Sequence, residues 1–353
     1  MRAAFGWIGI GALLLAGCAS VGPPSIGRDR FDYVNTISDS WKRQTLLNLL
    51  KVRYADAPVF MDVSSVISSY SLEGEVSLGG EYASPGRGDT FGSVGATGRY
   101  ADKPTISYQP LSGDKFAKSL MTPVPVTGFL FLIQSGYPAD LVLRICVNSI
   151  NGLENAYGGA GNPRAGSPEF RELMNALRES QAAGDTGFRV KPSKGEPGVV
   201  MFMRPSSDRV RVPSSRIREL LGLNAASHEF SVVYGSHPEQ DTEIAVLTRS
   251  LLQVMIDFAS YIDVPEADIA EGRVYSPQRT AEQERAFPPL ITVHHGASPP
   301  DDAYASVRYR NQWFWIDDRD RDSKFRLTFL MIMFSLTEGA PTQSAPVVTV
   351  PAR

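Results

Sequence analysis

The chain has 353 residues, of which 42% are hydrophobic, 21% are charged and 10% are aromatic, and its formal net charge is −3. This ordinary globular composition excludes the strong basic excess typical of nucleic-acid-binding chains, and the length fits one large domain or two smaller ones. Only two cysteines occur, Cys18 and Cys146. Cys146 lies in an apolar run, where we expect a small buried hydrophobic side chain and not a nucleophile.

The first 18 residues have the organisation of an export signal. Arg2 gives a short positive region, and residues 3–15 are uncharged and largely apolar. That segment is shorter than the roughly 20 residues that a spanning helix needs. It ends in Leu15-Ala16-Gly17-Cys18, which resembles the lipobox, the cleavage site of bacterial lipoproteins.

The resemblance implies that Cys18 is the lipidation site. In that family the chain is cut before the cysteine, the thiol takes a diacylglycerol, and the new N-terminus is acylated. Because each buried CH₂ contributes about 0.8 kcal/mol, several acyl chains (palmitate among them) give a stable membrane anchor. Ala19 follows the cysteine in place of Asp, and by the same resemblance this favours the outer membrane, with the body in the periplasm. The alternative is an uncleaved anchor, or an ordinary signal with a chance cysteine.

The next part of the chain is expected to be rich in strands. Residues 18–37 would form a lipidated tether, and a helix would run from the capping residues 38–40 to about Tyr54. Strands are then predicted at residues 59–67, 70–82, 90–100 and 105–109. The turn between the two longest strands falls at residues 84–89, a run rich in Gly and Pro.

The hairpin between residues 70 and 100 is predicted to be amphipathic, because apolar and polar residues alternate with a period of two. Its apolar face would carry these positions: Tyr70, Leu72, Val76, Leu78, Tyr82, Val94 and Tyr100. Strands of about 11 residues match the length needed to cross a bilayer at a tilt, and aromatic residues lie near the strand ends. One chain has too few strands to close a barrel, but several copies could close one together. The alternative is an ordinary hairpin with one face on a soluble core.

The remainder predicts alternating helices and strands on either side of a Gly-rich linker at 157–166, which would divide residues 38–156 from residues 167–337. Before the linker we expect helices at 114–121 and 125–135 and a strand at 141–150. After it, helices are expected at 167–184, 214–221, 242–262 and 324–336, and strands at 199–203, 230–234, 291–294, 304–310 and 313–316. A flexible tail would follow at 338–353. The fold class predicted from these elements is α+β, with mixed sheets and helices and a long amphipathic N-terminal hairpin.

One aromatic cluster suggests a binding surface. Trp313 and Trp315, beside Arg308 and Arg310, could form a platform on which a glycan or a partner stacks. The alternative is the core and rim of a hairpin. No metal is expected: His294 and His295 are adjacent strand residues and point to opposite faces, and the other histidines lack matching ligands.

The familiar enzyme signatures are missing from the sequence. It has no Gly-x-Ser-x-Gly, no paired histidines of a zinc helix, no dinucleotide-binding loop and no P-loop. We therefore expect no cofactor and a non-enzymatic outer-membrane lipoprotein that is a structural or assembly part of an envelope complex, such as one for export. Its partners would be the membrane, through Cys18, and other copies or envelope proteins, with no nucleic acid. The alternatives are a monomeric lipoprotein that binds a glycan, peptidoglycan or protein, and a periplasmic hydrolase.

Overall fold

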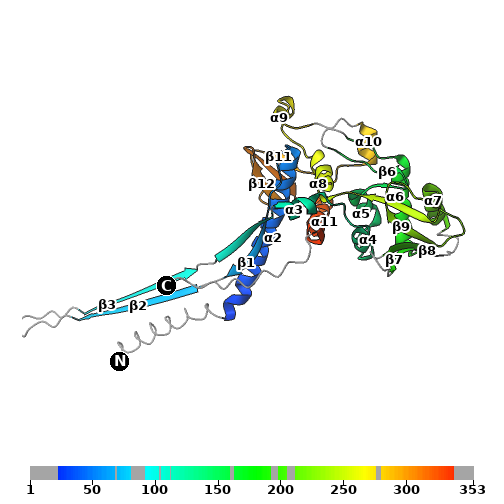
Figure 1. Ribbon diagram of the computed structural model, residues 1–353. Helices are drawn as coiled ribbons and strands as arrows, with labels where there is room; N and C mark the ends of the chain where they lie inside the picture. Colours follow the sequence, from blue (N-terminus) through cyan, green and yellow to red (C-terminus); the bar gives the residue numbers. More distant parts are fainter. Residues whose placement is uncertain are drawn as a thin grey trace, which may run out of the picture. The chain divides into compact units, whose positions relative to one another are not determined.

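The computed structural model describes residues 23–67, 70–80, 92–102, 105–111, 113–159, 163–191, 198–204, 211–275 and 280–337. The chain divides into two units, each made from two segments (Figure 1). Unit 1 comprises Met1–Ser40 and Phe60–Leu111, and unit 2 comprises Trp41–Val59 and Ser112–Arg353. Helices and mixed sheets both occur, so the predicted α+β class is confirmed.

The first described helix, α2 (Pro23–Arg53), is longer than the sequence predicts. It begins at a proline, whose fixed φ suits the first turn of a helix. The tether predicted up to residue 37 overlaps this helix from Pro23 onward. In unit 2 the last part of α2 buries Leu46, Leu49 and Leu50. The Asn48 amide fixes the chain that follows: its Nδ2 donates to the Val59 carbonyl at 2.9 Å and its Oδ1 accepts from Val59 N at 2.8 Å.

The described part of unit 1 contains four strands in two antiparallel pairs. β1 (Phe60–Ile67) pairs with β4 (Thr105–Leu111), and β2 (Tyr70–Gly80) pairs with β3 (Gly92–Asp102). The predicted turn at 84–89 and Tyr82 lie outside the described residues.

Unit 2 is built on a six-stranded sheet with the order β6-β5-β10-β9-β8-β7. Only the β9–β10 pair is parallel among these described strands. The strands are β5 (Val147–Ile150), β6 (Leu153–Glu154), β7 (Thr186–Lys191), β8 (Gly198–Met203), β9 (Glu229–Tyr234) and β10 (Glu243–Thr248). The helices gathered beside this sheet in Figure 1 are α4 (Val126–Gln134), α5 (Ala139–Cys146), α6 (Pro168–Ala183) and α7 (Arg211–Leu221).

A smaller three-stranded sheet has the order β11-β13-β12, and all its pairs are antiparallel. It comprises β11 (His294–Gly296), β12 (Ala303–Tyr309) and β13 (Gln312–Asp317). The remaining helices are α3 (Gly113–Met121), α8 (Leu251–Ser260), α9 (Glu266–Ala270), α10 (Ala281–Ala286) and α11 (Arg321–Thr337). Helix α11 buries Leu327, Phe329 and Leu330, as its apolar composition predicts.

Two predicted elements are wrong in the same way. Residues 141–150, expected as one strand, form the end of α5 and then β5. The helix expected over 242–262 begins with β10, and α8 starts only at Leu251, where Ser250 provides a complete capping box with Gln253. Residues 141–150 are a largely apolar run, and such runs do not distinguish a helix from a strand. In residues 242–262 the apolar spacing of three and four continues through β10 and α8, so it does not show where the strand ends and the helix begins.

The Gly-rich run at 157–166 does not coincide with the division between the two units. β5, before this run, pairs with β10, after it, within one sheet. Its first residues are also packed: Gly158 and Gly159 are buried, and Tyr157 exchanges two backbone hydrogen bonds with Arg164.

Candidate functional site

The four strands of unit 1 follow one register, and we call them together the β-ribbon. Ile67 pairs with Thr105, Tyr70 with Asp102 and Gly80 with Gly92. From each of these pairs to the next, the first residue moves forward along the chain by as many positions as its partner moves backward. The β2–β3 pair therefore continues the register of the β1–β4 pair. The one irregularity is a register shift between Val63 and Ser65, where a bulge increases the local twist.

The register places the predicted apolar positions opposite one another. Leu72 pairs with Tyr100, and Leu78 pairs with Val94. Because directly paired residues share a face of a sheet, these positions and that of Val76 are on one face of the ribbon. Glu73, which pairs with Arg99, is on the opposite face.

Both edges of the β-ribbon are open within the described part of the chain. No described strand pairs with β1–β4 or β2–β3 as a third strand. An isolated two-stranded ribbon is marginally stable in water, because each strand leaves half of its backbone hydrogen-bonding groups without protein partners.

The structure brings part of the predicted aromatic platform together. On the three-stranded sheet, Trp313 pairs with Arg308 of β12, while Trp315 pairs with His294 of β11. The His294 and Trp315 rings stack with centroids 5.9 Å apart. These residues share one face, whereas the alternate positions, Phe314 and Ile316, are fully buried. Trp313 and Trp315 are half-buried, so the face is partly open to solvent.

Arg310, the fourth residue of the predicted platform, contacts residues at the end of α2. It lies in the tight turn between β12 and β13, where Arg310 and Asn311 both have positive φ, as a two-residue hairpin turn of this type requires. Its guanidinium forms an ion pair with Asp56 at 3.2 Å and lies 4.9 Å from the centre of the Tyr54 ring. Arg310 therefore belongs to the contacts at the end of α2 and not to the tryptophan face.

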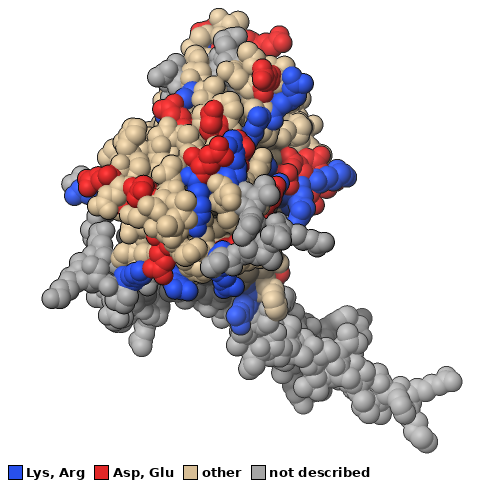
Figure 2. Space-filling model, turned by 90° about the vertical axis from the view of Figure 1, so that its right-hand side faces the viewer, with Lys and Arg blue, Asp and Glu red and all other residues tan. Residues whose placement is uncertain are grey.

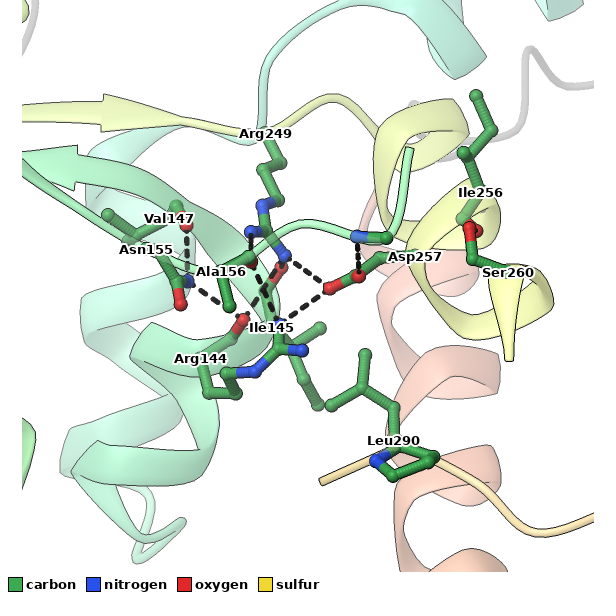
Figure 3. A network of polar contacts seen from close by, with 12 residues as sticks. Arg144, Ile145, Val147, Asn155, Ala156, Arg249, Ile256, Asp257, Ser260 and Leu290 are labelled. Atoms are coloured by element: carbon green, nitrogen blue, oxygen red, sulfur yellow. Dashed lines mark hydrogen bonds and ion pairs between the residues drawn. The ribbon is translucent and has the colours of Figure 1, made fainter. Parts of the chain in front are cut away.

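A buried network that the sequence does not reveal lies within unit 2 (Figure 3). Asp257 Oδ2 accepts from Arg144 at 2.6 Å and from Arg249 at 2.8 Å, and its Oδ1 accepts from Gly158 N at 2.7 Å. Arg249 and Asp257 are both 0% exposed. The Arg144 and Arg249 guanidinium groups also donate to the Ala156 carbonyl. Asn155 adds three bonds from its Nδ2 to main-chain oxygens at the end of α5.

The electrostatics of this network are those of a structural core. Burial alone would raise the pKa of Asp257, but the positive charges of Arg144 and Arg249 hold it below its usual range. Burial lowers the pKa of Arg249 to about 10, so the group stays charged at neutral pH. All three charges have partners, and none is free to bind or to transfer a proton. The network joins α5, α8 and the 155–158 segment.

Cys146 has the buried environment predicted for it. Its side chain is 0% exposed and its Sγ lies 3.8 Å from the sulfur of Met333. Burial raises the pKa of the thiol to about 12, so it carries no thiolate at neutral pH and is not a nucleophile.

An apolar cavity of about 540 Å³ lies between the six-stranded sheet and helices α4, α5 and α6. Its walls include Phe129, Leu143, Leu177, Met201 and Ile244. None of its described lining residues is charged, so it offers no acid–base group. In the described part of the chain there is also no group of three or more His, Cys, Asp or Glu side chains placed to hold a metal ion.

No helix within the described ranges is both long and apolar enough to cross a membrane. The lipidation residue predicted from the sequence, Cys18, lies outside the described residues. Comparison with known protein families, with curated proteins and with solved structures found no match.

Proposed function

We propose that this chain is an outer-membrane lipoprotein that acts without catalysis as an assembly component of an envelope complex. The acyl chains on Cys18 anchor it, unit 2 is its folded periplasmic body, and the long amphipathic hairpin at residues 70–100 is its membrane or oligomerisation element. Copies of the chain would place their hairpins side by side, so that each open edge pairs with a neighbour.

The observation that carries this proposal is the β-ribbon, whose two edges pair with no other strand among the described residues. In water such a ribbon exposes backbone groups and invites uncontrolled pairing. Closure among several copies satisfies every edge, and a closed barrel is the form of β-structure that a bilayer accepts. Eleven residues of β2 extend over about 36 Å. When tilted by about 45° this length suits the apolar band of an outer-membrane barrel, which is about 25 Å tall.

The test is the mass of the natively acylated protein in mild detergent, measured by light scattering. A matched variant replaces residues 70–102 with an Asn-Gly turn and keeps β1 and β4. We expect a defined oligomer for the intact chain and a monomer for the variant, with equal unfolding midpoints for unit 2. A monomer in both samples would overturn the proposal.

The second candidate is a monomeric lipoprotein that binds a glycan, peptidoglycan or protein ligand. The observation in its favour is the half-buried face that Trp313, Trp315, Arg308 and His294 share, because aromatic faces beside an arginine suit stacking. Quenching of tryptophan fluorescence by soluble peptidoglycan fragments, lost in Trp313→Ala, would support it. A Phe202→Ala variant, whose ring lies on a different sheet, is the control.

A further inference from the structure

A second cleft of unit 2 differs in chemistry from the apolar cavity. It has a volume of about 510 Å³ and lies between α6, the first turns of α5 and α11, and residues 286–290. This volume falls within the range of about 300–1,000 Å³ that small-molecule sites occupy.

Among the described residues that line this cleft, five are arginines and two are acidic. The arginines are Arg144, Arg171, Arg178, Arg321 and Arg326, and the acids are Asp140 and Asp322. The described lining therefore has an excess of positive side chains. Over the face of the molecule drawn in Figure 2, basic and acidic side chains are interspersed.

Three of these arginines have partners. Arg144 bonds to the buried Asp257. Arg178 is 3.6 Å from Asp140, and Arg326 is 3.7 Å from Asp322. Arg326 also donates to the Leu290 carbonyl at 3.1 Å.

The other two, Arg171 and Arg321, form no ion pair with any residue in the described ranges, although both line the cleft. Both side chains are exposed to solvent. Two guanidinium groups that have no carboxylate partner in those ranges, next to apolar walls, are therefore accessible to an anion from outside the chain.

The fold explains why these arginines line the same cleft. Arg171, Asn175 and Arg178 are spaced four and three residues apart on α6, so they lie on one face of that helix. Arg321 is the first residue of α11. The Asp320 carboxylate already accepts from Ser323 N at this helix end, so the positive charge that α11 brings to the cleft is that of its arginine side chains.

The same cleft has an apolar part. Leu141, Met174, Phe287, Leu290 and Phe325 also line it, and Phe325 is 43% exposed although its side chain is large and apolar. The lining therefore suits a ligand with a doubly accepting anionic group on one side and an apolar group on the other.

We propose that this cleft binds a phosphate ester, with Arg171 and Arg321 as its principal ligands. A phosphate group accepts paired hydrogen bonds from two guanidiniums, and its negative charge neutralises the excess of the cleft. The apolar walls hold the organic part of the ester. The phosphate has two candidate sources, a lipid headgroup and a small soluble ester, and they share this chemistry.

The experiment uses the full acylated chain in mild detergent and isothermal titration calorimetry with three probes. The probes are inorganic phosphate, glycerol phosphate and short-chain phosphatidylglycerol. The test variant is Arg171→Gln with Arg321→Gln. The control is Arg43→Gln with Arg204→Gln, which removes the same charge from exposed positions outside the cleft. Matching circular dichroism and unfolding midpoints establish that all variants fold.

We expect binding that weakens about 10-fold or more in the test variant and is unchanged in the control. Tighter binding of phosphatidylglycerol than of glycerol phosphate would identify the lipid as the source, and equal binding would identify a soluble ester. The proposal is overturned if no probe binds, or if the test and control variants bind alike.

Discussion

At the scale of single residues, Asp257 is the shared anionic partner of two buried guanidinium groups, those of Arg144 and Arg249. Replacing it with Asn leaves both positive charges buried without an anion. Removal of one partner from a buried ion pair costs about 3–5 kcal/mol of unfolding free energy. We expect a loss of that order for Asp257→Asn, measured by urea denaturation.

The matched control is an exposed ion pair of the same unit. Glu229 lies 2.7 Å from Lys191, and both side chains are about half exposed. Because water screens such pairs, Glu229→Gln should leave the urea midpoint almost unchanged. Equal losses in the two variants would show that burial does not set the contribution of Asp257.

The lowered pKa of the Asp257 carboxylate predicts that its contribution to the unfolding free energy decreases at low pH. The pKa of Asp257 is lower in the folded chain than its usual value, so its stabilising contribution is present above the unfolded pKa of about 3.9 and is lost as the pH falls through the folded pKa. The difference in unfolding free energy between the wild type and Asp257→Asn should therefore shrink below about pH 4. Urea titrations of both proteins from pH 3 to 7 measure it, and a constant difference over this range would contradict the assignment.

Gly158 is required where the 155–158 segment approaches α8. A Cβ added at this position would lie 2.4 Å from the Cβ of Ser260 and 2.9 Å from the ring of Tyr261. Since Gly158 N also bonds to Asp257, the segment cannot move away freely. We expect Gly158→Ala to lower the unfolding free energy by about 1–3 kcal/mol.

Gly198 provides the comparison, because its added Cβ would meet only the Lys191 carbonyl at 3.9 Å. Thermal unfolding should show a small change for Gly198→Ala. A similarly small change for Gly158→Ala would mean that the segment packs less tightly than these distances indicate.

At the scale of elements, sequence signals succeed where the determinant is local. Helix α6 is confirmed at both ends, because Ser167 caps the amide of Phe170 and Gly184 ends the helix with φ of 73°.

The Asp257 network gives no such local signal in the sequence. Its two arginines, Arg144 and Arg249, stand 113 and 8 positions from Asp257 in the sequence. Arg249 also lies in the run of residues 242–262, where the sequence predicts one continuous helix. Likewise, the phosphate cleft draws Arg171 and Arg321 from distant helices, and only the fold brings them together.

The β-ribbon allows a test of which face meets lipid. Val76 and Ser77 are adjacent in β2, so they belong to opposite faces, and both are near the middle of the strand. If the proposed apolar face contacts hydrocarbon, Val76→Arg disfavours insertion by about 2–4 kcal/mol. Ser77→Arg places the same charge on the other face and should be tolerated.

The readout is the fraction of acylated oligomer recovered from membranes, measured by detergent extraction and light scattering. We expect a large loss for Val76→Arg and near wild-type recovery for Ser77→Arg. The opposite order would indicate that the polar face is the buried one, and equal recovery would place the ribbon outside the bilayer.

At the scale of the whole molecule, the chain order has a consequence for assembly. Unit 2 is formed by residues on both sides of the β-ribbon, Trp41–Val59 before it and Ser112–Arg353 after it. The ribbon is thus inserted in the sequence between the two segments that form unit 2.

We therefore expect the backbone protection of the ribbon to depend on assembly. In a lone ribbon, about half of the amides in β2 and β3 point outward and exchange rapidly. Pairing with neighbouring copies protects these amides as well, while protection in the six-stranded sheet stays constant. Hydrogen-exchange mass spectrometry of monomer and oligomer, with β8 and β9 as the internal reference, measures the difference. Equal exchange of β2 and β3 in both states would separate the ribbon from assembly and leave the tryptophan face as the leading functional surface.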